Sequence, residues 1–424
     1  MTESDLAIVA ALVFAWGVLS GRLERFDVTA PIIFVAAGLV LTHGPLAPLG
    51  IQPSNELVKA MAEFTLVLVL FTDASRVGLH EMRPDLGLYL RLLGLALPLT
   101  IGLGTLLALA VPGIGGIWLA LLVGAALAPT DAALGAGIMS SPRVPARIRR
   151  LINVESGLND GIATPFVTVA LAGEATTEHI SGTTPAVAVA ELALGLVVGV
   201  AVGGVGGLVV RAARQRGWAD AGFAGLAVLG LALCAYAAAL ALDGNGFIAA
   251  FTGGLAFGTV SGRPRVPLVP FAEEVGALVS LLTWLAFGAV AVAPAITRLT
   301  WPIAGYAVLS LTLIRMLPVA ASLAGTRLGG PTVGFVGWFG PRGLVSVVFA
   351  LLALEELGRR DAAPAVTVIS VTVLLSVIAH GATAEPLARR YATGLGRGHG
   401  PAHVSRSELP PRRLTRRRAD SGTC

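Results

Sequence analysis

Ala128-Pro129-Thr130-Asp131 and Glu155-Ser156-Gly157-Leu158-Asn159-Asp160-Gly161 place acidic side chains inside two apolar segments that are long enough to cross a bilayer. An ionisable group near the bilayer centre costs several kcal/mol unless it faces other protein groups or a water-filled cavity. Acidic residues in spanning helices therefore most often mark a path for ions or protons. These two stretches set both the fold class and the kind of function to look for.

The composition of the whole chain supports a membrane protein. Of its 424 residues, 55% are hydrophobic and only 13% are charged, which lies outside the range of soluble globular proteins. A helix needs roughly 20 apolar residues to cross the hydrocarbon core, and lipid offers its backbone no other hydrogen-bond partners. The chain is therefore predicted to be an all-α polytopic membrane protein.

About thirteen apolar runs are candidates for membrane crossings. They fall at residues 6–20, 29–45, 57–72, 86–111, 117–139, 151–172, 186–210, 219–242, 246–260, 275–297, 301–323, 332–354 and 364–388. Residues 394–424 follow the last run, and there Gly, Pro and Arg replace the apolar residues. This composition predicts a transmembrane domain over residues 1–388 and a disordered basic tail over residues 394–424.

The placement of arginine predicts the topology, because short cytoplasmic loops are enriched in Lys and Arg. Arginine-bearing connections alternate with connections that are nearly free of arginine, such as 111–116, 173–185 and 243–246. The exception is the pair Arg359 and Arg360, which lies among acidic residues. With the basic tail assigned to the cytoplasm, an odd number of crossings places the amino terminus outside. The net charge of +5 is spread over these loops and the tail, so nucleic-acid binding is not implied.

Pro129 interrupts the run at 117–139 near its middle. A proline inside a helix removes a backbone hydrogen bond and clashes with the preceding turn. Transporters place ion sites at interrupted helices, because the freed carbonyls and half-helix ends become ligands near the membrane midplane. Thr130 and Asp131 are therefore candidate ligands; the alternative is an ordinary proline kink with Asp131 paired to a neighbouring donor.

The run at 151–172 carries a polar patch. Glu155 and Asn159 are four residues apart, and so are Ser156 and Asp160, which places two polar pairs on adjacent stripes of one helix. Asp160 can hold a proton or a dehydrated monovalent cation but hardly both, and this exclusivity is the minimum chemistry of exchange. Asn159 hydrogen-bonds without titrating. The alternative is a satisfied polar contact between helices.

Two arginines, Arg315 and Arg342, lie in late apolar runs, and each needs a buried partner. An arginine paired with Glu155 would form a structural ion pair and leave Asp160 free to titrate. Asp73 has Arg76 three residues further on, so an interfacial salt bridge and a role in the cation path both stay open. His380, in the last run, is expected to bond a backbone carbonyl.

These motifs together resemble the sodium/proton exchanger family, the electroneutral branch of the monovalent cation:proton antiporters. The resemblance rests on Pro129-Thr130-Asp131, on Glu155-Ser156 followed by Asn159-Asp160, and on Arg342-Gly343. The sequence departs from the family pattern at Ala132, where many members have Pro, and at Gly157, where many have Leu.

The resemblance implies a fold and a set of roles. The fold is an inverted repeat with two broken crossing helices, expected at 117–139 and 364–388, in a homodimer. Core helices are expected at 86–172 and 301–388, dimerisation helices at 6–72 and 219–297, and a linker helix at 186–210. The implied cation and proton ligands are Asp160, Asp131, Ser156, Thr130 and Asn159, and Asp73 is implied near the access path.

The resemblance also implies a structural ion pair between Glu155 and Arg342. Arg315 resembles a second family arginine less closely.

The function implied is electroneutral exchange of one monovalent cation, Na+ first and Li+ or K+ as alternatives, for one proton by alternating access. Frequent Arg, Ala and Gly with a single Lys suggest a bacterial gene, and so a plasma-membrane protein for pH and salt homeostasis. No cofactor and no enzymatic activity are expected. The alternatives are a cation channel and an intramembrane aspartyl protease that uses Asp131 and Asp160, although the usual Tyr-Asp and Gly-x-Gly-Asp contexts of that protease are missing.

Overall fold

Every element of secondary structure that the computed structural model describes is a helix. The described residues are 3–23, 28–43, 55–77, 82–135, 144–177, 184–220, 223–262 and 269–397. Each of the apolar runs overlaps at least one of these helices. The all-α prediction is thus confirmed, whereas the predicted tail lies outside the described residues from residue 398 onward.

The amino-terminal half of the chain forms the first set of helices, and the four between Arg83 and Ala108 follow one another without a gap. These helices are α1 (Glu3–Leu23), α2 (Ala30–His43), α3 (Asn55–Arg76), η3 (Arg83–Asp85), α5 (Leu86–Arg91), η4 (Leu92–Ala96), α6 (Leu97–Ala108), α7 (Ile117–Ala126), η5 (Ala132–Gly135) and α9 (Ala146–Thr177).

The carboxyl-terminal half forms the second set. These helices are α10 (Pro185–Gln215), α11 (Ala224–Leu240), α12 (Gly246–Val260), α13 (Pro270–Phe287), η6 (Gly288–Val292), α14 (Ala293–Thr297), α15 (Trp301–Leu311), α16 (Leu313–Ser322), α17 (Gly330–Trp338), α18 (Leu344–Glu356), α19 (Gly358–Asp361) and α20 (Ala363–Arg397). In the described part of the chain, six helical stretches are long and apolar enough to cross a membrane, and four shorter apolar helices accompany them.

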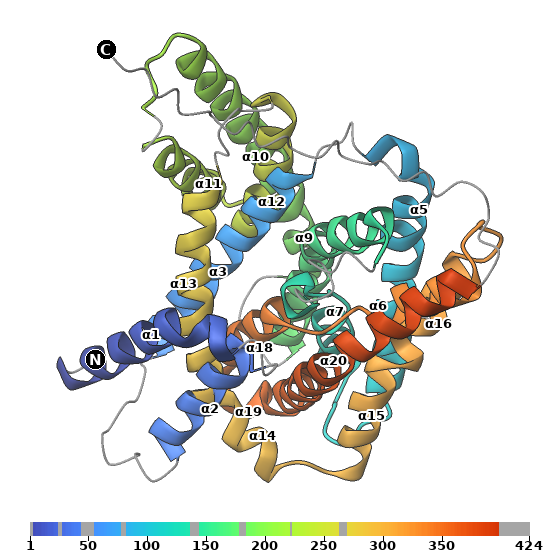
Figure 1. Ribbon diagram of the computed structural model, residues 1–424. Helices are drawn as coiled ribbons and strands as arrows, with labels where there is room; N and C mark the ends of the chain where they lie inside the picture. The colour runs from blue at the N-terminus through green and yellow to red at the C-terminus, as the bar shows by residue number, and fades with distance from the viewer. Residues whose placement is uncertain are drawn as a thin grey trace, which may run out of the picture.

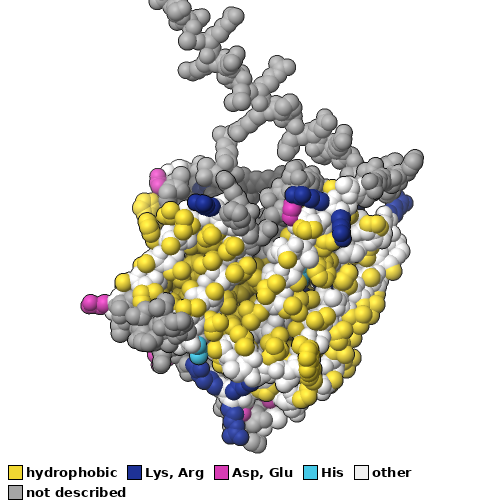
Figure 2. Space-filling view, turned by 60° about the horizontal axis from the view of Figure 1, so that its bottom comes forward, with side chains coloured by type: hydrophobic (Ala, Val, Ile, Leu, Met, Phe, Trp, Pro, Cys, Tyr) yellow, Lys and Arg dark blue, Asp and Glu magenta, His cyan; other side chains and the backbone are white. Residues whose placement is uncertain are grey.

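The surface of the molecule suits a lipid environment. Figure 2 shows hydrophobic side chains spread across one face, with most of the charged side chains of that face near its margins. Many large apolar residues are exposed, among them Leu106, Val197, Val205 and Ile378. Apolar patches of this extent mark contact with a membrane or with partners. The chain is therefore a multi-pass membrane protein.

The helices fall into two groups with the site helices between them. Helices α3, α10, α11, α12 and α13 pack together on one side, and α5, α6, α15, α16 and α20 lie on the other, with α7, α9 and α18 in the middle (Figure 1). Gly199 and Gly203 of α10 approach α12 so closely that a methyl group at either position would overlap the α12 backbone. Glycine permits this close approach because it has no side chain.

Two helices are broken at the centre of the molecule. Helix α7 ends at Ala126 and is followed by η5 from Ala132; α17 ends at Trp338 and is followed by α18 from Leu344. The first break, around Pro129, was predicted. The assignment of the second break to 364–388 was wrong, because α20 runs unbroken through Pro386. The second break lies instead at residues 339–343, where Pro341 disfavours helical backbone at Gly340 before it.

Candidate functional site

The break after α7 exposes backbone carbonyls that Arg342 binds. The Arg342 guanidinium donates through Nη1 to Ala128 O at 2.8 Å and to Pro129 O at 3.2 Å, and through Nη2 to Ser310 O at 3.3 Å. Ser310 lies in the last turn of α15. The carboxyl-terminal end of a helix carries partial negative charge. The buried cation is therefore stabilised by the ends of two helices.

Asp131 joins the two breaks. Its backbone N–H donates to Pro341 O at 2.8 Å, and its Oδ2 accepts from the Leu344 N–H at 3.1 Å. Leu344 is the first residue of α18, so the Asp131 carboxylate stabilises the amino terminus of that helix. A methyl group at Gly343 would overlap this carboxylate. The approach of the two broken segments thus depends on glycine at position 343.

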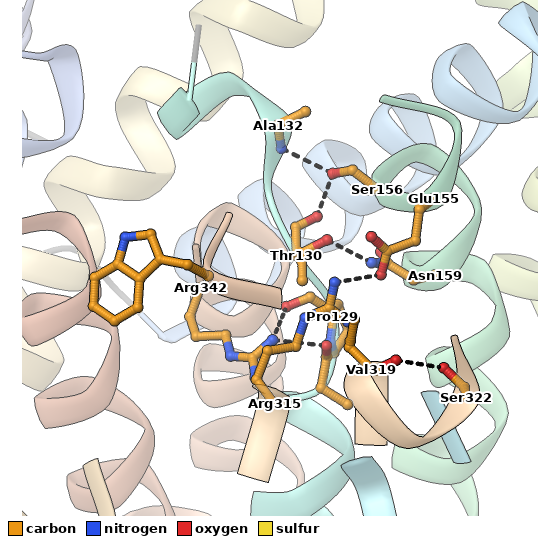
Figure 3. A network of polar contacts seen from close by, with 12 residues as sticks. Pro129, Thr130, Ala132, Glu155, Ser156, Asn159, Arg315, Val319, Ser322 and Arg342 are labelled. Atoms are coloured by element: carbon orange, nitrogen blue, oxygen red, sulfur yellow. Dashed lines mark hydrogen bonds and ion pairs between the residues drawn. The ribbon is translucent and has the colours of Figure 1, made fainter. Parts of the chain in front are cut away.

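Helix α9 fixes the break of α7 from the other side (Figure 3). Ser156 Oγ donates to Thr130 O and accepts from the Ala132 N–H at 2.8 Å. One turn further on, Asn159 Nδ2 donates to Thr130 Oγ1 at 2.7 Å. The spacing of Ser156 and Asn159 on the helix therefore places both side chains against the same unwound segment.

Asp160 lies beside this contact and is only 6% exposed. Among the described residues, no protein donor bonds its carboxylate, and its charged neighbours are the carboxylates of Asp73 and Asp131. Asn159 Oδ1 is also buried without a hydrogen-bond partner in the described part of the chain. Oxygen atoms with negative charge and no donor suit a proton or a small cation.

Asp73 belongs to this group of acids rather than to a salt bridge with Arg76. It lies on α3 and packs against Gly157 of α9, where a methyl group at the glycine would lie 3.5 Å from Asp73 Cβ. Arg76 instead donates through Nε to Glu273 Oε1 of α13 at 2.6 Å. Asp73 therefore lies beside the polar face of α9, at van der Waals distance from the position of Gly157.

The two buried arginines have different partners. Arg315 of α16 forms an ion pair with Glu155, with Nη2 2.6 Å from Oε1 and both side chains 1% exposed. The sequence resemblance implied Arg342 as the partner of Glu155, and the structure corrects this. Arg342 is fully buried, and the hydrogen bonds of its guanidinium go to carbonyls. Glu155 is thus neutralised within the protein, while Asp160, five residues further on, is not.

Helix α20 supports the second break through Ser376 and His380. Ser376 Oγ accepts from the Arg342 N–H at 2.6 Å, and His380 Nε2 lies 2.9 Å from Trp338 O. The expectation that His380 bonds a carbonyl is confirmed. Sequence reasoning missed Ser376 and Ser310; the spacing of Ser376 and His380 placed them on one stripe of a helix, but nothing in the sequence identified the segment that this stripe contacts.

Two broken helices that meet beside buried acids, inside a multi-pass helical fold, define a secondary transporter. The sequence profile of the family described as "Sodium/hydrogen exchanger, transmembrane" matches residues 8–390. The chain therefore belongs to the sodium/hydrogen exchanger family. This agrees with the resemblance found in the motifs, and it does not support the channel and the protease.

Two curated relatives are the K(+)/H(+) antiporter NhaP of Alkalimonas amylolytica and the K(+)/H(+) antiporter NhaP2 of Shewanella oneidensis. The first is 27% identical over 371 residues, which cover 85% of this chain and 62% of the relative. The second is 24% identical over 422 residues, which cover 96% of this chain and 68% of the relative. The chain thus spans about two thirds of the length of these relatives.

Among solved structures, the chain is similar to the structure, solved at pH 8, of the sodium proton antiporter MjNhaP1 from Methanocaldococcus jannaschii. The TM-score is 0.74 at 20% sequence identity, and the match covers 91% of this chain and 98% of that one. This likeness confirms the fold class.

Proposed function

We propose that the chain exchanges a monovalent cation for a proton across a bacterial plasma membrane by alternating access. The observation that carries the proposal is the Asp160 carboxylate, which is buried beside a helix break and has no protein donor among the described residues. A carboxylate in this position binds either a proton or a dehydrated cation, and the competition between the two couples their movements.

The proposed ligands surround Asp160. Asp131, Ser156 and Thr130 contribute oxygen atoms at the break of α7, and Asp73 contributes a carboxylate from α3 on the side of the dimerisation helices. Asn159 fixes the break through Thr130. Glu155 and Arg315 hold α9 and α16 together as an ion pair. The cation and the proton are substrates, and the mechanism needs no resident cofactor.

Electroneutral exchange follows from the pairing of Asn159 with Asp160. If Asp160 alone carries the exchanged proton, one cation moves against one proton and no net charge crosses. The membrane potential, worth about 2.3 kcal/mol per elementary charge per 100 mV, then neither drives nor opposes the cycle. The curated relatives are named K(+)/H(+) antiporters, whereas the similar solved structure is of a sodium proton antiporter. Both ions therefore belong in the test.

The moving parts are proposed to be the two groups of helices. The core comprises residues 86–172 and 301–388, and it moves against dimerisation helices at 6–72 and 219–297 of a homodimer, with 186–210 as linker. The alternation of arginine along the chain supports an outside amino terminus and a cytoplasmic carboxyl terminus.

The test is proton flux in proteoliposomes with an imposed pH gradient, read by a pH-sensitive dye after separate additions of Na+, Li+ and K+. We expect at least one cation to dissipate the gradient, and Asp160→Asn to reduce this flux to the level of empty liposomes. Asp243→Asn is the matched control: Asp243 is exposed at the end of α11 with a φ of 56°, which asparagine tolerates.

A second arm of this test addresses stoichiometry. Exchange by the wild type should not respond to a membrane potential set with an ionophore, whereas Asn159→Asp adds a second carboxylate and should make exchange potential-dependent. No response to any cation would refute the exchange function. A wild type that responds to the potential would refute only the one-to-one stoichiometry.

A further inference from the structure

Two adjoining cavities lie between α16, α17 and α20, and none of the proposed ion ligands lines either of them. One has a volume of about 470 Å³ and the other about 490 Å³. Met316 and Gly334 line both, so the cavities form one groove. Helix α16 and the carboxyl-terminal end of α20, drawn in red, lie at the right side of the molecule in Figure 1.

The lining of the second cavity is mainly apolar, and there is unfilled space beside Gly334. Phe335, Phe339 and Leu387 contribute hydrophobic side chains. A methyl group built at Gly334 would have no atom within 4 Å, unlike the central glycine Gly343, where it would overlap a side chain. The groove therefore has room for an apolar chain of roughly the width of a side chain.

One charged residue, Arg390 of α20, lines the groove. Its side chain is exposed, and in the described part of the chain no carboxylate pairs with it. The adjacent Arg389 differs, because its Nε donates to Glu385 Oε1 at 2.7 Å. Arginine binds phosphate through directional, charge-assisted hydrogen bonds. An apolar groove that ends at an available arginine has the two chemical requirements of an anionic lipid.

One side of the groove is formed by α17, the helix that ends at the second break. Phe335 of α17 stacks on Tyr391 at a ring-centroid distance of 4.3 Å, and Trp338 stacks on His380 at 5.1 Å. Thr332 Oγ1 lies 3.0 Å from Tyr391 OH. One face of α17 thus packs against α20, while Gly334 faces unfilled space. An occupant of the groove contacts the half-helix that leads directly into residues 339–343.

We propose that the groove binds one anionic glycerophospholipid, with an acyl chain along Met316 and Gly334 and the phosphate on Arg390. The occupant must be apolar along most of its length and negative at one end. The chain's own arginine-rich segment at 412–418 has the same sign of charge as Arg390 and does not meet this requirement. A zwitterionic lipid meets the first requirement but has no net negative charge.

Thermal stability of the purified protein in detergent tests the binding without relying on transport. Phosphatidylglycerol is added to one sample and phosphatidylcholine with the same acyl chains to another, and unfolding is followed by intrinsic tryptophan fluorescence. We expect phosphatidylglycerol to raise the melting temperature of the wild type, and Arg390→Gln to lose at least half of that rise. Arg389→Gln, the neighbour already paired with Glu385, should keep it.

A groove-filling variant gives an independent test. Gly334→Leu places a side chain where the structure has space, so it should fold with a melting temperature near that of the wild type and lose the response to phosphatidylglycerol. An equal response in the wild type and in Arg390→Gln would overturn the proposal, as would an equal response to the two lipids. A response to both lipids that Gly334→Leu alone removes would indicate a lipid groove without headgroup selection and would also overturn it.

Discussion

The two helix breaks that meet at the centre of the molecule present opposite polar groups. The break after α7 presents mainly acceptors, including the carboxylate of Asp131 and the oxygens of Thr130. The break between α17 and α18 presents donors, namely the guanidinium and N–H of Arg342 and the N–H of Leu344. The second break therefore supplies a cation of the protein itself, because the Arg342 guanidinium binds the Ala128 and Pro129 carbonyls of the first break. Thr130 and Asp131 of the first break are the proposed ligands of the transported cation.

The same contrast separates two acids on α9. Glu155 has a fixed arginine partner, whereas Asp160, just over one turn away, has none among the described residues. A buried ion pair contributes little net stability, but removing one partner leaves an uncompensated charge. Within the described part of the chain, α9 thus carries one acid that is paired and one, Asp160, that has no such partner, and the exchange proposed above depends on the second.

The largest expected effect comes from breaking the fixed pair. Arg315→Gln or Glu155→Gln alone should lower the free energy of unfolding by about 3–5 kcal/mol, because each leaves a buried charge without its partner. The double variant should regain much of this loss, since it removes both charges. Thermal unfolding monitored by size-exclusion chromatography measures the difference.

The exposed pair Arg389–Glu385 is the control for this cycle, with side chains 66% and 40% exposed. Its removal should cost no more than about 1 kcal/mol, because water and salt screen exposed pairs. If the double variant at Glu155 and Arg315 were as unstable as the sum of the single variants, the two residues would not act as a pair.

A smaller effect is expected where the two breaks touch. Gly343→Ala should displace the Asp131 carboxylate from the Leu344 N–H, which costs about 1–2 kcal/mol for a lost helix cap. The same displacement should weaken cation binding, because Asp131 is a proposed ligand. Both the melting temperature and the apparent KM for the cation therefore report on this variant.

Gly305→Ala is the matched control, because Gly305 is exposed on α15 and a methyl group there meets no atom within 4 Å. This variant should be as stable as the wild type or more so, since alanine favours a helix over glycine by up to about 1 kcal/mol. Unchanged stability and KM in Gly343→Ala would show that the breaks do not depend on their close approach.

The sequence predicted much of this comparison but not the position of the second break. Apolar runs and Pro129 located the helices and the first break, because both signals are local. The second break was assigned to 364–388 through the family resemblance, by the position of that run along the chain. Helix α20 is continuous through Gly381 and Pro386, and the packing that keeps it straight cannot be deduced from the local residue types.

The sequence also could not identify the partners of the two buried arginines. Arg315 and Arg342 both lie in apolar runs, and residue type does not distinguish the one that reaches Glu155. Arg342 is bound mainly by backbone carbonyls, which every residue has and which therefore leave no pattern. In contrast, the spacing of Ser156, Asn159 and Asp160 was informative because a helix fixes which of them share a face.

The smallest expected effect concerns the support of the second break by α20. Ser376→Ala removes the acceptor of the Arg342 N–H, and a typical hydrogen bond contributes about 1 kcal/mol, which corresponds to about a fivefold rise in apparent KM. Ser376→Thr keeps the hydroxyl and should restore the wild-type value. Ser370→Ala is the control, because Ser370 is equally buried on α20 but its Oγ has no partner in the described part of the chain. A KM unchanged in Ser376→Ala, or raised equally in Ser370→Ala, would mean that α20 contributes packing alone and that the Arg342 segment holds its position without it.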